Sequence, residues 1–167
     1  MKKFSLLVAV VALISGCCLL LGNSSASAAT LSSLKPKQVA ATVLVASAKK
    51  NAGWRSFVKG YQDDDMDLSV LVSENNSSVQ DNYSQPGTGT AYAFELDDSD
   101  QGMLNDYTIS SDGKYVYCYQ QPFHDSADRQ VSPFLVLPAS KILAMQHSAS
   151  ANEINDIANN IKIEVGD

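Results

Sequence analysis

Cysteine and histidine are scarce in this chain of 167 residues, which has three cysteines and two histidines. Cys17 and Cys18 stand in an apolar N-terminal segment, and Cys118 is the only cysteine in the rest of the sequence. If that segment is removed, no intrachain disulfide can form, and the fold must rest on its hydrophobic core. Cys118 stands in an alternating segment, where we expect a small buried side chain rather than a reactive thiol.

Long apolar runs are missing after the first 28 residues, and cofactor-binding motifs are missing throughout. Beyond residue 28 no stretch of 18 apolar residues occurs, so we expect the body of the protein to be soluble. The sequence contains no phosphate loop, no zinc-ligand spacing and no dinucleotide fingerprint. We therefore expect no cofactor and no resident metal.

Acidic residues are missing from residues 29–60. That segment contains six bases, which are Lys35, Lys37, Lys49, Lys50, Arg55 and Lys59. Residues 61–128 contain fourteen acids and one base, and the whole chain has a formal net charge of -6. Because so acidic a surface repels polyphosphate, we do not expect nucleic-acid binding. We expect the basic segment to rest against an anionic lipid or polymer of the cell envelope.

The first 28 residues have the pattern of a secretory leader, in which Met1-Lys2-Lys3 precede an apolar run over residues 4–21. Cys17 ends an Ile-Ser-Gly-Cys stretch that looks like a bacterial lipobox, whereas Ala28 ends an Ala-Ser-Ala site for ordinary signal peptidase. Lipidation at Cys17, release after Ala28 and retention of the leader as an anchor all stay open. Each outcome predicts an extracellular protein, secreted or attached to the outer face of the membrane.

The rest of the chain is predicted to be a short flexible tether, residues 29–35, followed by a single domain, residues 36–167. Helical spacing of apolar residues comes first, alternation occupies the middle, and helical spacing returns at the end. This order predicts an α+β fold, with an antiparallel sheet and with the N-terminal helix and the C-terminal helices packed on one face.

The expected helices cover residues 36–50, about 139–147, and a segment starting at Ser150, which stands in capping-box spacing with Glu153. Gly53 and Gly60 are expected to limit the segment between them to a short turn. The expected strands cover residues 66–73 and 90–97, a hairpin within 106–120, a run ending at Leu137, and a closing segment over 161–165. Residues 74–89 are polar without periodicity and predict a mobile loop.

The strongest local signal is Asp112-Gly113 between two alternating runs, which predicts a hairpin with a type I′ turn. The register that follows pairs Ile109 with Val116 on the core side. It places Tyr115, Tyr117 and Tyr119 in a row on the other, polar side. We take these three tyrosines as candidate ligand-binding residues for a glycan or a protein, because aromatic rings with a polar end suit such contacts.

Acidic residues near the first strand have part of a calcium-loop spacing. Asp63, Asp65, Asp67 and Glu74 occupy positions 1, 3, 5 and 12 of an EF-hand-like loop. Position 6, where the loop needs glycine, is Leu68, and the same residues alternate as a strand. We therefore expect a solvated acidic strand entry and no calcium site.

The two histidines offer little catalytic chemistry. His124 stands in a polar segment with Asp125 and Asp128, so a Ser-His-Asp arrangement is conceivable. No G-x-S-x-G motif supports it, and His147 falls in the last turn of a predicted helix, where a cation is favourable. A secreted hydrolase or enzyme-modulating protein that uses the His124 loop is thus the alternative interpretation.

Three segments resemble a family of small exported proteins of lactobacilli, many of which are lipoproteins. They are "LSSLKPKQVAATVLVASAKKNAGWRSF", "YTISSDGKYVYCYQ" and "EINDIANNIKI". The resemblance implies a Gram-positive host, an envelope location and one domain, and it supplies no catalytic residue. Our leading hypothesis is a non-enzymatic envelope protein that acts as a binding or accessory module.

Overall fold

The computed structural model describes residues 29–63, 67–96, 103–122 and 130–166, and it has an α+β fold. Six strands form one sheet in the order β5-β4-β3-β2-β1-β6. Their bounds are β1 Leu68–Ser73, β2 Ala91–Leu96, β3 Met103–Ile109, β4 Tyr115–Pro122, β5 Leu135–Pro138 and β6 Lys162–Val165. Neighbouring strands are antiparallel except β6, which runs parallel to β1. The fold class predicted from the sequence is therefore confirmed.

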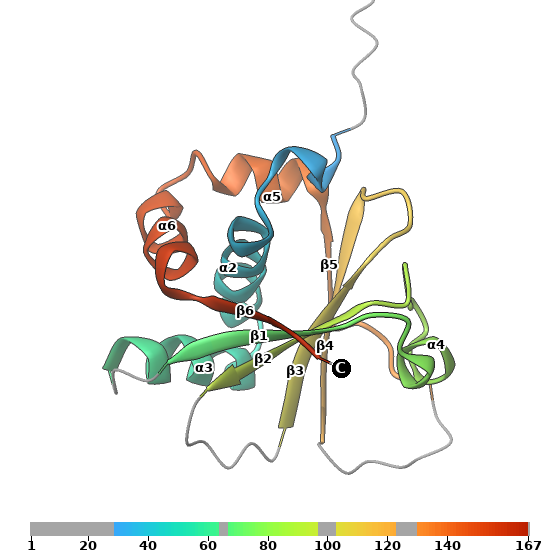
Figure 1. The fold of residues 1–167 in the computed structure, drawn as a ribbon. Helices are drawn as coiled ribbons and strands as arrows, with labels where there is room; N and C mark the ends of the chain where they lie inside the picture. The colour runs from blue at the N-terminus through green and yellow to red at the C-terminus, as the bar shows by residue number, and fades with distance from the viewer. Residues whose placement is uncertain (1–28, 64–66, 97–102, 123–129, 167) are drawn as a thin grey trace, which may run out of the picture.

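Helices cover the sheet unequally on its two faces (Figure 1). The helical segments are η1 Leu31–Ser33, α2 Pro36–Ala48, α3 Ala52–Asp63, α4 Ser77–Asn82, α5 Ala139–Met145 and α6 Ala151–Asn160. The N-terminal and C-terminal helices α2, α3, α5 and α6 pack on one face, as predicted. Val79 of α4 joins a separate cluster with Ala91 and Tyr119 on the opposite face.

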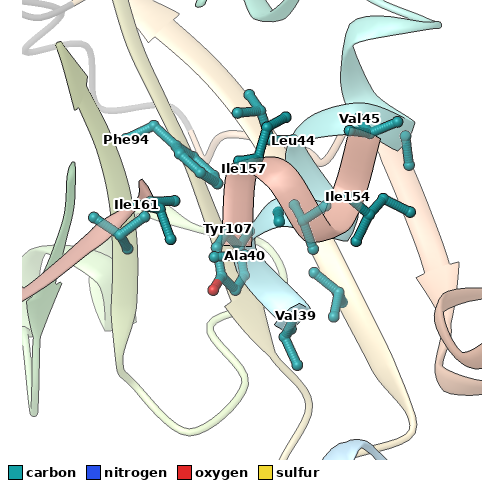
Figure 2. Packing of buried hydrophobic residues seen from close by; sticks show 14 of the residues in the cluster. Val39, Ala40, Leu44, Val45, Phe94, Tyr107, Ile154, Ile157 and Ile161 are labelled. Atoms are coloured by element: carbon teal, nitrogen blue, oxygen red, sulfur yellow. The ribbon is translucent and has the colours of Figure 1, made fainter. Parts of the chain in front are cut away.

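Helix α2 forms the centre of the core. Every residue from Val39 to Ala48 is buried, as expected for a helix that is apolar on all sides. It lies between α6, which supplies Ile154 and Ile157, and the sheet, which supplies Phe94 and Tyr107 (Figure 2). Because the buried members of the main core cluster among the described residues lie within 31–161, we expect the chain from residue 29 onwards to fold by itself.

The β3–β4 hairpin has the predicted register but a different turn. Ile109 pairs with Val116, as expected. A type I′ turn would need positive φ at both Asp112 and Gly113, yet within the described residues only Gly113 of these two has it, at 67°. The Gly113 amide donates to the Ser110 carbonyl at 2.8 Å, which is the closure of a type I turn followed by a left-handed glycine.

The predicted mobile loop over residues 74–89 is wrong, because it contains helix α4. The side chain of Asn76 caps this helix by accepting a hydrogen bond from the amide of Val79 at 3.3 Å. Burial of Val79 and Tyr83 then holds the segment against the sheet. Packing, rather than helical propensity, stabilises so short a helix.

Two further expectations are corrected near the N-terminus. Residues 29–35 are not a free tether, because Leu31 is buried in the core and its amide donates to the Gly113 carbonyl at 3.1 Å. The short turn predicted between Gly53 and Gly60 is instead the full helix α3. The side-chain oxygen of Asn51 accepts from the Gly53 and Trp54 amides at its start.

The capping box predicted at the start of α6 is also absent from the described structure. The Ser150 side chain makes no capping hydrogen bond to the helix. Its hydroxyl instead accepts from Lys49 Nζ at 2.7 Å, which links the start of α6 to the C-terminal end of α2.

A Gly53→Ala substitution is expected to lower the free energy of unfolding by about 1–3 kcal/mol, although alanine normally favours a helix over glycine. A Cβ at position 53 would lie 1.7 Å from Gln120 Nε2. Hydrogen bonds to Asn51 and Asn105 fix that amide. Urea unfolding measures the effect, with the exposed Ser56→Ala in the same helix as control. Equal or greater stability of Gly53→Ala would contradict the close packing.

Among the described residues, no helix is both long and apolar enough to cross a bilayer.

Candidate functional site

The hairpin places the three candidate tyrosines on the face opposite the core helices, but at very different depths. Tyr115 is 43% exposed, Tyr117 is half-buried and Tyr119 is completely buried. The Tyr119 hydroxyl donates to the Gln85 carbonyl at 2.8 Å, and its ring stacks on Tyr83 with centroids 4.3 Å apart. The segment predicted to be a loop thus covers Tyr119, which leaves Tyr115 and Tyr117 to contact a ligand.

Two neighbouring strands build the exposed part of this face. Tyr117 pairs with Val136 of β5, and Tyr115 pairs with Pro138. Val136 is 46% exposed and Pro138 is exposed, while the rings of Tyr115 and Tyr117 stack with centroids 6.4 Å apart. We call Tyr115, Tyr117, Val136 and Pro138 the edge patch.

The backbone of β5 offers little to a partner, although this strand forms an edge of the sheet. β5 has four residues and ends in Pro138, which has no N–H group. Short edge strands with proline resist pairing with another chain. A partner of the edge patch is therefore expected to contact side chains rather than extend the sheet.

A buried polar cluster lies next to the edge patch on the same face. Tyr83 donates a short hydrogen bond to Asp106 Oδ2, and Gln121 Nε2 donates to the Tyr83 hydroxyl at 2.8 Å. The hydroxyl of Thr108, on the same strand as Asp106, donates to the Gln85 carbonyl at 2.8 Å. These bonds hold the segment after α4 on the sheet.

Asp106 has an unfavourable environment for its negative charge. It is 1% exposed, and its second oxygen, Oδ1, is buried without a hydrogen-bond partner among the described residues. Burial raises the pKa of this carboxyl to about 6, against a smaller lowering by the Tyr83 hydrogen bond. Burial and the neighbouring Asp106 also raise the pKa of Tyr83. The cluster is therefore built around a carboxyl group that titrates in a mildly acidic range.

The basic segment does not form one surface. Lys35 and Lys37 stand at the start of α2, whereas Lys49 and Lys50 follow its end. A helix of 13 residues separates the two pairs by about 18 Å. Of the other two bases, Arg55 donates to the Ala48 carbonyl at 3.2 Å and Lys59 lies 3.9 Å from Asp63. The lysine pairs at the two ends of α2 therefore belong to two separate basic patches.

The acidic candidates do not gather around a common point in the described structure. Asp63 faces Lys59, and Asp67 forms a short ion pair with Lys162. Within the described ranges, no three His, Cys, Asp or Glu side chains lie close enough together to hold a metal ion. Asp65, a further member of the calcium spacing, lies outside the described residues.

The histidines also do not form a site in the part of the chain that the structure describes. His147 is exposed just after α5. His124, with Asp125 and Asp128, lies outside the described residues. The hydrolase alternative therefore stays an interpretation of the sequence.

Cys118 is buried in the core, and burial raises the pKa of its thiol to about 12. In the chain from residue 29, native Cys118 is therefore expected to react with a disulfide reagent at least about a thousandfold more slowly than a free thiol, since the reactive thiolate is rare. Absorbance of the released thiolate measures the rate, and the urea-unfolded protein is the control. Fast labelling of the folded protein would contradict the burial of this thiol.

Sequence reasoning missed three contributors to this face, Val136, Tyr83 and Asp106. Residues 135–137 are all apolar, so no pattern in the sequence marks Val136 as the side chain that faces outward. Tyr83 was hidden in a segment interpreted as a loop. Asp106 pairs with Tyr119 on the polar face of the hairpin, and nothing in its neighbours along the chain signals that another segment covers it.

Comparison with protein-family models, curated proteins and solved structures finds no match.

Proposed function

We propose that this protein is an exported envelope domain of a Gram-positive bacterium, which binds an envelope component through the edge patch and has no catalytic role. The leader-like residues 1–28 support export. The observation that carries the binding role is the pair Tyr115 and Val136, which lie on neighbouring strands and are 43% and 46% exposed. Exposed aromatic and aliphatic side chains that lie together often mark an interaction site.

The location of the polar cluster supports the same proposal. Hydrogen bonds from Tyr83, Thr108 and Tyr119 fix the segment beside the edge patch. The edge patch itself lies on the paired strands β4 and β5, and a contact surface that is ordered before binding loses little conformational freedom. The edge patch is therefore suited to bind a partner without rearrangement of the sheet.

A Tyr115→Ser/Val136→Ser variant is expected to be retained about tenfold less on isolated Gram-positive envelopes, because two half-exposed side chains lose their apolar contact. Sedimentation of the purified chain from residue 29 with envelopes measures retention. The matched control is Val165→Ser, which removes a side chain that is 72% exposed on β6. Equal retention of the double variant and the control would contradict a binding role for the edge patch.

Export is tested separately with the full chain. Fractionation locates the protein, and its intact mass distinguishes lipidation at Cys17 from cleavage after Ala28. Retention of the full chain inside the cell would contradict the envelope location whatever the edge patch binds.

A further inference from the structure

We propose that the edge patch docks on an anionic lipid surface, together with the lysines at the same end of the molecule. This inference rests on the proposed function, because it assigns an occupant to the same patch. We call residues 29–37, 110–115 and 135–141 the entry end, since the described chain begins there. These three segments contain the whole edge patch except Tyr117.

Hydrogen bonds join the three segments of the entry end. The Leu31 amide donates to the Gly113 carbonyl at 3.1 Å, and the Ala139 amide donates to the Lys114 carbonyl at 2.7 Å. Figure 1 shows η1, α5 and the β3–β4 turn gathered at one end of the molecule. These bonds thus bring segments that are distant in sequence together at one end of the molecule.

This end has the opposite charge to the chain as a whole. Its charged residues are the four bases Lys35, Lys37, Lys114 and Lys141 and the single acid Asp112. Asp112 lies 3.0 Å from Lys114, so the remaining three lysines are not balanced by an acid of these segments. In a chain of formal net charge -6, the entry end is thus a part that suits an anionic surface.

Apolar side chains favour a lipid surface over a soluble polyanion as the partner. Tyr115, Val136 and Pro138 are exposed on segments of this same end. Phosphate polymers would contact only the lysines, whereas a lipid headgroup region also accepts tyrosine rings and aliphatic groups. Apolar residues flanked by lysines are therefore typical of an interfacial contact.

The leader brings the same end close to a membrane. Residues 18–28 separate the lipidation candidate Cys17 from Ala29. A random coil of eleven residues has an end-to-end distance of about 18 Å. Lipidation at Cys17 would hold the entry end, and not the opposite end of α2, within reach of the lipid headgroups. After release at Ala28, the lysines and the edge patch would have to supply the attraction alone.

Vesicle sedimentation of the purified chain from residue 29 tests this inference. Binding to phosphatidylcholine vesicles is compared with binding to vesicles that also contain phosphatidylglycerol, at low and high ionic strength. The charge variant is Lys37→Glu/Lys141→Glu at the entry end. Its matched control is Lys49→Glu/Lys50→Glu, which changes the net charge equally at the other end of α2. Tryptophan emission verifies that each variant is folded.

We expect at least about tenfold stronger binding to the anionic vesicles, with loss at high salt. Lys37→Glu/Lys141→Glu should weaken that binding at least about tenfold, and the Lys49→Glu/Lys50→Glu control far less. Tyr115→Ser/Val136→Ser should weaken it several-fold, whereas Val165→Ser should not. These results would support the docking of the entry end on lipid.

Other results would overturn the inference. If both charge variants weakened vesicle binding equally, the attraction would depend on the net charge of the protein and not on the entry end. Binding to purified wall polymer but not to anionic vesicles would identify a polymer as the partner. Because this assay needs no export, its failure would leave the envelope location standing, and failed export would leave the vesicle result standing.

Discussion

A Trp54→Ala variant is expected to lose about 3–5 kcal/mol of the free energy of unfolding, the largest loss from a single side chain that we predict. Trp54 is completely buried, and its ring meets Phe94 edge-on with centroids 5.2 Å apart. Its Nε1 donates to the Tyr119 carbonyl at 3.1 Å. The substitution therefore removes a large apolar contact between α3 and the sheet and leaves a buried carbonyl without its partner.

Urea unfolding followed by circular dichroism measures this loss, because the variant lacks the only tryptophan of the chain. Phe134→Ala is the matched control. The ring of Phe134 lies 5.9 Å from the same indole but is 38% exposed, so we expect a loss below about 1.5 kcal/mol. Similar losses in the two variants would contradict the central position of Trp54.

The second large effect is a pH dependence of stability that originates at Asp106. Its pKa of about 6 in the folded protein lies above the value near 4 expected in the unfolded chain. The folded state therefore binds the proton more tightly, and stability from this group is greatest below pH 4. It declines as the pH rises from about 4 to about 6, by roughly 3 kcal/mol in total, and then levels off.

An Asp106→Asn variant should remove this decline, because an amide does not titrate. It retains an oxygen that can accept from Tyr83, so the cluster keeps its main hydrogen bond. Asp112→Asn is the control with the opposite sign. Hydrogen bonds from Ser110 and Lys114 lower the pKa of exposed Asp112 to about 2, so its contribution is lost only as the pH falls below about 4. Unfolding curves at several pH values distinguish the contributions of the two aspartates. If the stability of Asp106→Asn still declined between pH 4 and pH 6, the pH dependence would not originate at Asp106.

The hairpin shows what the sequence could predict well. The turn expected at Asp112-Gly113 predicted the register, and alternation through β3 and β4 agrees with it, since a shift by one residue would turn every apolar side chain outward. The turn type was predicted wrongly because the dipeptide Asp112-Gly113 fits more than one turn. Only the left-handed glycine was required, and the observed connection over residues 111–114 also supplies it.

The segment over residues 74–89 shows why local patterns failed. Asn, Ser and Gln favour turns, and six residues of α4 are too few to reveal helical periodicity. The helix is held by Val79 and Tyr83, whose partners on β2 and β4 are set by the sheet and not by neighbouring residues. The glycines at 53 and 60 likewise led to the wrong prediction of a short turn where α3 forms. Gly53 is needed for its approach to Gln120 of β4, which the sequence does not reveal.

The candidate face was predicted only in part, because local patterns do not show which distant segments pack on it. The row of tyrosines followed from alternation within one strand. The covering of Tyr119 and the exposure of Val136 depend on segments that come from elsewhere in the chain. Local periodicity therefore identified which side chains share the face, and tertiary contacts decided which of them a partner can reach.

The central helix α2 is synthesised before several of the segments that bury it. Its ten successive buried residues are synthesised early, but α5, α6 and β6 emerge much later. The bond from Gln146 to the Gln38 carbonyl spans 108 positions, and the ion pair of Lys162 with Asp67 spans 95. Contacts this distant slow folding and leave apolar segments exposed meanwhile. We therefore expect folding to be completed only after the C-terminal third has emerged, with α2 as the segment most in need of protection until then.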